Sequence, residues 1–200
     1  MKKIKPDRNE RLKWYDAKGN TTYRINYKLN DSSVVVDVGA RTGEWADLIR
    51  DKYKCEVHCF ECLPDFCLTL YEKGYRVYAY AVWDKDDVID IGFENDQASV
   101  YCDPRKAHVS TQVIEASRIF ELIKFDHIDL LKLNVEGAEY GILDNLIYTG
   151  NITKIDNIQV QFHLYEVGME GMYYELANRL KKTHYTTYKF PFIWENWRIK

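Results

Sequence analysis

The sequence predicts an α/β fold with a mostly parallel sheet of seven strands and helices on both faces. Short apolar stretches of strand length alternate with longer stretches in which apolar residues recur at helical spacing, which is typical of parallel sheets. Near the C-terminus, two aromatic stretches are separated only by a turn at Pro191, which predicts an antiparallel edge to this sheet.

The first strand is predicted over residues 33–39, because three consecutive valines lie before a glycine turn at Gly39. A helix is expected over residues 44–53, where large apolar residues such as Trp45 and Ile49 recur along one side. This strand, turn and helix form the first unit of the predicted fold.

The second strand is expected over residues 56–61. Pro64 opens the next helix, since proline is favoured in the first turn, and Gly74 ends this helix after Lys73. A third strand is predicted over residues 75–82 from its alternating side chains.

The middle of the chain, residues 84–115, departs from this alternation. Residues 88–93 and 98–102 have the composition of short strands, and residues 103–106 that of a turn or loop. We therefore interpret residues 84–116 as an insertion on the substrate side of a single domain.

Alternation resumes with a helix that Ser117 is expected to cap, with Glu121 in its first turn. The remaining predicted elements are a strand over 128–133, a helix over 139–148, a strand over 155–162, a helix over 169–182, and strands over 186–190 and 192–198. The whole chain, residues 1–200, is expected to form one domain, with residues 1–32 contributing to the site.

Charge and hydropathy narrow the class of protein. The chain has 28 basic and 31 acidic side chains, a net charge of −3 and a pI near 6.0. This balance does not favour a general binder of phosphate backbones, so no nucleic-acid partner is expected. Apolar runs are far shorter than the roughly 20 residues of a spanning helix, so no membrane association is expected. The basic N-terminus lacks a following hydrophobic stretch, which predicts a cytoplasmic location, or a host's cytoplasm for a viral protein.

Five cysteines are present, an odd number that favours free thiols over a disulfide framework. The four from Cys55 to Cys67 are spaced by four, three and five residues and lack the paired C-x2-C pattern of zinc sites. We expect no metal.

Residues 37–43 and Glu61 together predict a nucleotide-type site. In parallel sheets, ligands bind beyond the carboxyl ends of the strands, where Gly39 permits a tight turn and Gly43 lets the next helix start close to a ligand. Glu61 ends the second strand, where a carboxylate can accept hydrogen bonds from both ribose hydroxyls. The rival interpretation is that Asp37 stabilises the loop and Glu61 is a surface acid.

Arg41 occupies the position at which a dinucleotide site needs a second glycine to approach the pyrophosphate, so NAD and FAD fit poorly. S-adenosylmethionine has no pyrophosphate and fits better. We expect Asp37 to meet its methionyl ammonium, directly or through water, and the Gly39 turn to lie against its amino-acid tail.

The chain also resembles the FkbM-type S-adenosylmethionine-dependent methyltransferases. The resemblance is carried by NYKLNDSSVVVDVGA at 26–40, CFECLPDF at 59–66, DLLKLNVEGAEY at 129–140, NIQVQFH at 157–163 and FPFIWENW at 190–197. It implies a Rossmann-like class I methyltransferase fold and a reaction usually at oxygen, with sugars and polyketide hydroxyls among the acceptors.

Carried over by position, the resemblance and the loop together predict nine cofactor-binding residues. They are Asp37, Gly39, Ala40, Arg41, Gly43, Glu61, Ala81, Val82 and Asn134, of which Ala81 and Val82 match the adenine side. Two residues depart from the family's pattern: Cys62 stands where proline is common, and Asn134 where aspartate is usual. An amide is neither a base nor an anionic metal ligand, so any such role of the aspartate is lost or moved here.

Methyl transfer to a hydroxyl requires removal of its proton, and a general base contributes roughly 10²–10⁴ to the rate. His163 and Glu136, each following a predicted strand, are the candidate bases. The rival interpretations are a hydrogen-bonded strand-end histidine for His163 and an N-cap or ribose-edge contact for Glu136. Glu139 is interpreted as a first-turn acid that complements the helix dipole.

Five residues are predicted on the acceptor side: Ser99, Tyr101, Arg105, His108 and Tyr165. Together these observations predict O-methylation of a sugar hydroxyl, for example of a deoxyhexose such as rhamnose or fucose, in glycan or natural-product biosynthesis. The alternatives are a nitrogen or small non-sugar acceptor, or a non-catalytic module that retains the fold. The expected partners are a small-molecule or glycan acceptor and a fused or separate glycosyltransferase.

Overall fold

A sheet of seven strands runs through the computed structural model, which describes residues 5–94, 97–99 and 108–200. In spatial order its strands are β10-β11-β9-β8-β1-β2-β3. Their bounds are β1 Val35–Val38, β2 Val57–Phe60, β3 Arg76–Tyr78, β8 Leu130–Leu133, β9 Asn157–Val160, β10 His184–Phe190 and β11 Trp194–Ile199. Strands β1, β2, β3, β8 and β9 pair with one another in parallel. Strand β11 pairs antiparallel with β9 and with β10, which forms the antiparallel edge that the sequence predicted.

Helices cover both faces of this sheet. They are α2 Glu44–Tyr53, α3 Pro64–Glu72, α4 Ile119–Ile123, α5 Glu139–Tyr148 and α6 Met169–Leu180. α2 and α3 pack on one face around Trp45, Ile49 and Leu70, and the other three helices pack on the opposite face. This sandwich confirms the predicted fold class and buries the four residues of each central strand.

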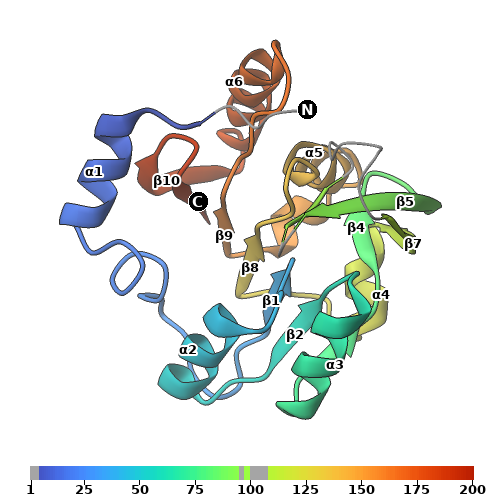
Figure 1. Cartoon of the computed structure of the whole chain (residues 1–200). Helices are drawn as coiled ribbons and strands as arrows, with labels where there is room; N and C mark the ends of the chain where they lie inside the picture. The colour runs from blue at the N-terminus through green and yellow to red at the C-terminus, as the bar shows by residue number, and fades with distance from the viewer. Residues whose placement is uncertain (1–4, 95–96, 100–107) are drawn as a thin grey trace.

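A second sheet lies beside the first. Its order is β4-β7-β5-β6, with β4 Ala81–Trp83, β5 Asp87–Glu94, β6 Gln97–Ser99 and β7 His108–Glu115. Strand β5 agrees with the short strand predicted over 88–93, whereas β7 was not predicted. Figure 1 shows β4, β5 and β7 on the right, on the side away from α1. The third predicted strand, 75–82, is therefore not continuous, because the chain bends at Tyr80 and leaves the first sheet after β3.

The region before α4 also differs from the prediction. Ser117 does not cap a helix; it lies inside the 3-10 turn Ala116–Arg118, and its hydroxyl donates a hydrogen bond to Glu115. Arg118 occupies the cap position of α4 and supplies no side-chain cap, while Glu121 lies in the first turn as expected.

The N-terminal segment contains a helix that the sequence analysis did not predict, α1 Arg8–Asp16, capped by Asp7. Its Trp14 packs against Ile193 and Trp194 at the β10-β11 edge. Further along, the carbonyl of Arg24 accepts hydrogen bonds from Trp45 and from Gln159 of β9. The segment thereby covers the sheet face that also carries α2. In the described part of the chain, no helix is both long and apolar enough to span a bilayer.

Candidate active site

A cavity of about 370 Å³ opens at the carboxyl ends of the central strands, where the strand order reverses between β1 and β8. Its walls come from the loops after β1, β2, β8 and β9 and from the second sheet. Of the predicted site residues, seven line it: Gly39, Arg41, Glu61, Ala81, Val82, Asn134 and Glu136. The sequence therefore located the cavity at the correct edge of the sheet.

The glycine turn after β1 is fixed by a close approach of two backbones. Gly39 has a φ of 75°, and a Cβ atom at this position would lie 2.2 Å from the backbone oxygen of Asn134. Both the left-handed conformation and the lack of space require glycine. The turn can then pass directly beside the end of β8 and form the floor of the cavity.

Asp37 is not among the residues that line the cavity, and its predicted contact with the cofactor, directly or through water, stays a prediction. Because side chains alternate along β1, Asp37 lies on the other face from Val38, which does line it. Its carboxylate is fully buried and accepts a hydrogen bond of 2.7 Å from Lys132, which also donates to the Gly39 carbonyl at 2.8 Å. This pair holds the turn in place. These contacts are the ones expected if Asp37 stabilises the loop.

Ala40 and Gly43 also lie outside the cavity lining. Ala40 is buried against the α2 side of the core. Gly43 has a φ of 84° at the start of α2, where a Cβ would lie 2.9 Å from Leu70. The absence of a Cβ atom at Gly43 lets α2 pack against α3, and its predicted contact with the cofactor stays a prediction.

Glu61 is buried and connects two loops at the cavity wall. One carboxylate oxygen accepts the amide N–H of Arg41, and the other accepts those of Cys62 and Leu63. Four lone-pair positions on a carboxylate leave room for further donors. The carboxylate is therefore held at the end of β2 with capacity to accept ribose hydroxyls.

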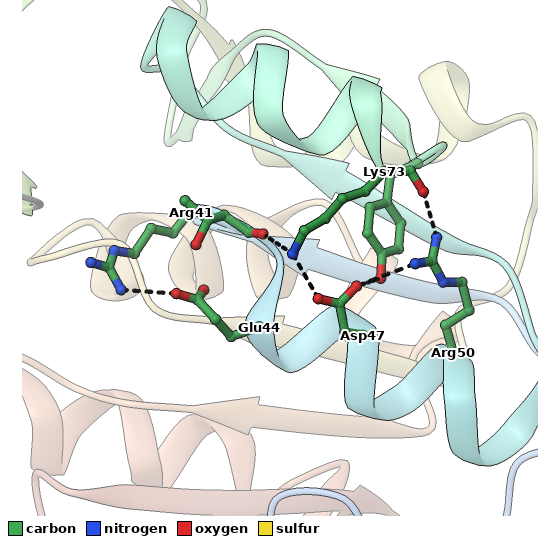
Figure 2. A network of polar contacts seen from close by, with 7 residues as sticks. Arg41, Glu44, Asp47, Arg50 and Lys73 are labelled. Carbon is green, nitrogen blue, oxygen red and sulfur yellow. Dashed lines mark hydrogen bonds and ion pairs between the residues drawn. The ribbon is translucent and has the colours of Figure 1, made fainter.

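A network of ion pairs supports the same loop from outside (Figure 2). Lys73, which follows α3, donates to the Thr42 carbonyl and to Asp47 of α2, each at 2.7 Å. Tyr75 and Arg50 donate to the other oxygen of Asp47. Burial alone would raise the pKa of Asp47, but the hydrogen bonds from Lys73 and Tyr75 hold it below its ordinary value.

The far wall of the cavity is apolar and belongs largely to the second sheet. Ala81 and Val82 lie in β4, at the predicted adenine side, with Tyr80 and Trp83 on either side of them. Ile89, Ile91 and Val113 complete this wall. The insertion was predicted to lie on the substrate side, but no local pattern singled out these three residues.

Asn134 lines the cavity after β8, and its buried Oδ1 has no hydrogen-bond partner within the described residues. A buried carbonyl oxygen without a donor is costly. This atom is an acceptor available to a ligand's N–H or O–H group.

The candidate bases lie together beside the cavity. Glu136 lines it and has a φ of 51°, a left-handed conformation that is strained for a side chain of this kind. His163 lies behind Glu136 and is not part of the lining; its Nε2 is 3.5 Å from a Glu136 oxygen. The hydroxyl of Tyr165, a residue predicted on the acceptor side, donates a hydrogen bond of 2.5 Å to the other carboxylate oxygen of Glu136.

Glu139 has a role that the sequence analysis missed. It lies in the first turn of α5, as predicted, but it is fully buried and its Oε1 is 2.7 Å from Nδ1 of His163. It also accepts the amide N–H groups of Val135 and Gly137. The dipole interpretation was therefore incomplete, because the side chain joins the loop, the helix and His163.

The other predicted acceptor-side residues are less informative. His108 begins β7 and is exposed, outside the cavity lining. Ser99 ends β6. Tyr101 and Arg105 lie outside the described residues. The predicted roles of these four residues stay predictions.

The described cysteines Cys55, Cys59, Cys62 and Cys67 are free thiols, as predicted. Burial raises the pKa of Cys67 to about 11. In the described ranges, His127, Asp129 and Asp156 form a group with metal-ligand atoms within 4.8 Å of one another. They precede β8 and β9, at the edge of the sheet opposite the cavity.

The strand order, the cavity at its reversal point and the carboxylate after β2 define a Rossmann-like class I methyltransferase. Residues 37–193 match the profile of the methyltransferase FkbM domain. The chain belongs to this family and uses S-adenosylmethionine as its methyl donor.

The chain is similar to solved structures at low sequence identity. An rRNA methylase from Streptococcus thermophilus superposes with a TM-score of 0.53 and 9% identity, over 92% of this chain and 94% of that one. TrmK of M. capricolum in complex with S-adenosylhomocysteine gives a TM-score of 0.44 and 11% identity, over 93% and 68% of the two chains. A search of curated protein sequences found no match.

The residues at the cavity fit S-adenosylmethionine. Glu61 would hold the ribose, and the β4 wall would hold the adenine. The buried Oδ1 of Asn134 has no partner among the described residues and would accept from the methionyl ammonium; Oδ2 of Asp37 is buried and partnerless in the same sense. The turn at Gly39 lines the cavity, where its backbone would contact the amino-acid tail.

Proposed function

We propose that this methyltransferase methylates a hydroxyl oxygen of a sugar, such as a deoxyhexose, during the synthesis of a glycan or natural product. The supporting observation is the pairing of Glu136 with His163 beside the cofactor cavity. A hydroxyl acceptor must lose its proton, and a carboxylate paired with an imidazole beside the cavity can take it up.

Glu136 is the member of the pair that reaches the cavity, so we assign it the first contact with the acceptor hydroxyl. Tyr165 fixes one of its oxygens and leaves the other toward His163. S-adenosylmethionine supplies an electrophilic methyl group when bound. The chain's own residues orient the acceptor oxygen, take up its proton and exclude water behind the apolar wall of Ile89, Ile91 and Val113.

The test is methyl transfer to a panel of nucleotide sugars, oligosaccharides, amines and small non-sugar metabolites, detected as a mass gain of one CH2. We expect transfer to sugar hydroxyls, and a Glu136→Gln variant that is ~10²–10⁴-fold slower because the base is lost. Glu166→Gln, at an exposed glutamate in the loop between β9 and α6, is the control and should retain full turnover. Transfer to amines alone, or full turnover by Glu136→Gln, would contradict the proposal.

A further inference from the structure

The contacts of Glu139 extend beyond what a helix-capping acid needs. An acid in the first turn of a helix stabilises it from a solvent-exposed position by up to about 1 kcal/mol. Glu139 instead has no exposed surface, and each of its oxygens accepts a backbone N–H from the loop before α5. Its third contact, to His163, crosses 24 residues of sequence.

The contact to His163 fixes the state of the imidazole ring. An ionised carboxylate can only accept hydrogen bonds, so Nδ1 of His163 must carry the hydrogen in this 2.7 Å contact. The lone pair of the neutral ring is then on Nε2, which is buried and has no hydrogen-bond partner among the residues described. Nε2 is oriented toward Glu136 at 3.5 Å.

The ring is also held from its backbone. The hydroxyl of Tyr140, the residue after Glu139, donates a 3.1 Å hydrogen bond to the carbonyl oxygen of His163. Two successive residues of α5 therefore hold His163, one through the ring and one through the main chain. The same helix turn fixes the loop that carries Glu136.

We propose that Glu139 is a positioning residue that keeps Nε2 of His163 ready to receive the acceptor's proton from Glu136. This inference rests on the proposed function. In the step, the methyl carbon–sulfur bond breaks with its electrons left on sulfur, and the acceptor oxygen–carbon bond forms. The acceptor proton passes to Glu136 and on to Nε2, and Glu139 balances the charge of the resulting imidazolium.

The first test needs neither cofactor nor acceptor. A histidine Nδ1–H bonded to a buried carboxylate gives a strongly deshielded proton resonance, because charge-assisted hydrogen bonds are short. We expect this resonance in the wild type, its loss in His163→Gln, and a large upfield shift in Glu139→Gln. The control is Glu121→Gln, the exposed first-turn glutamate of α4, which should leave the resonance unchanged.

The second test measures methyl transfer by the same variants. Glu139→Gln should lower kcat by ~10–100-fold, since a neutral amide cannot balance the imidazolium, with the acceptor KM within about 3-fold. An unchanged kcat in Glu139→Gln would reduce Glu139 to a residue that holds the loop and would overturn the inference, as would an unchanged resonance. If Glu139→Gln does not fold, the test rests on the wild type and His163→Gln. The inference is then overturned if the wild type shows no deshielded resonance that disappears in His163→Gln.

The two proposals fail in different ways. If the resonance behaves as expected but no hydroxyl compound is methylated, the acceptor class is wrong and the Glu139–His163 contact stands. If sugars are methylated at equal rates by the wild type and Glu139→Gln, the proposed function stands and the role of Glu139 is refuted.

Discussion

At the scale of single residues, the site depends on buried charges that the sequence alone does not pair. Lys132 lies on β8 beside Asp37 of β1, with the two strands in parallel register. Each charge would be costly inside the sheet without the other. Through this pairing Asp37 stabilises the turn at Gly39, although Asp37 is not among the residues that line the cavity.

Gly39→Ala tests the close approach of the turn to β8. Alanine at this position meets both an unfavourable φ and the Asn134 oxygen, so we expect a loss of ~2–4 kcal/mol in the free energy of unfolding and of ~10-fold or more in affinity for S-adenosylhomocysteine. Denaturant titration and calorimetry measure these effects.

Gly150→Ala is the matched control for this variant. Gly150 has the same φ of 75°, but a Cβ atom there would have no neighbour within 4 Å. It should lose only ~1 kcal/mol and bind the ligand normally. Equal losses of unfolding free energy in both variants would show that the close approach of Gly39 to Asn134 does not contribute to stability.

The sequence predicted some residue roles and missed others for identifiable reasons. Gly39 and Glu61 each end a predicted strand, at the edge of the sheet where ligands bind, so their positions at the cavity could be predicted. The contact of Glu139 with His163 could not, because acids are common in first turns and the contact depends on how α5 meets the end of β9. A buried partner 24 residues away leaves no local pattern.

At the scale of elements, α3 is tied to the loop before α2 by the side chain of Lys73 (Figure 2). The tether crosses 31 residues of sequence and holds the Thr42 carbonyl directly. It links two βα units whose loops both reach the cavity. The position of the glycine loop therefore depends on α3 as well as on β1.

Lys73→Met tests this tether while keeping most of the side chain's length. Hydrogen bonds of partly exposed lysines contribute about 1 kcal/mol, so we expect that loss in the free energy of unfolding and a ~3–10-fold weaker binding of S-adenosylhomocysteine. Lys182→Met, an exposed lysine after α6, is the control. Ligand affinity equal to the wild type in calorimetry would show that the loop holds its position without Lys73.

The break between β3 and β4 illustrates why some elements escaped prediction. The chain bends where the amide of Tyr80 bonds to the carbonyl of Tyr78, and neither glycine nor proline marks the bend. The alternation of residues 75–82 continues through it unchanged. Which of two sheets receives β4 is decided by its pairing with β7, a strand that follows only at His108–Glu115.

At the scale of the whole molecule, two buried histidines make stability depend on pH. Burial lowers the pKa of His58 and of His184 below the ordinary 6.5, against the opposing effects of Glu56 and Asp156. The unfolded chain therefore binds these protons first. The contribution of these two histidines to the free energy of unfolding should be fully present above about pH 6.5. It should be lost as the pH falls from 6.5 through their lower pKa values in the folded state.

His184→Gln isolates one of these contributions. Nε2 of His184 contacts the Ile155 carbonyl, and a glutamine amide can donate there without titrating. We expect the melting temperature of this variant to fall less than that of the wild type between neutral and mildly acidic pH. His108→Gln, at an exposed histidine, should keep the wild-type slope, and an identical slope for His184→Gln would contradict the assignment. Glu195, whose pKa burial raises, acts in the opposite direction in all three proteins.

The second sheet has a consequence for how such enzymes diversify. Its strands β5 to β7 lie in one continuous segment between β4 and α4, while Gly39, Glu61 and Asn134 lie outside that segment. An exchange of residues 84–115 between related genes would replace Ile89, Ile91 and Val113 in one wall of the cavity and leave Gly39, Glu61 and Asn134 in place. Evolution can therefore reshape one wall of the cavity by replacing a single continuous segment, while the loops after β1, β2 and β8 stay as they are.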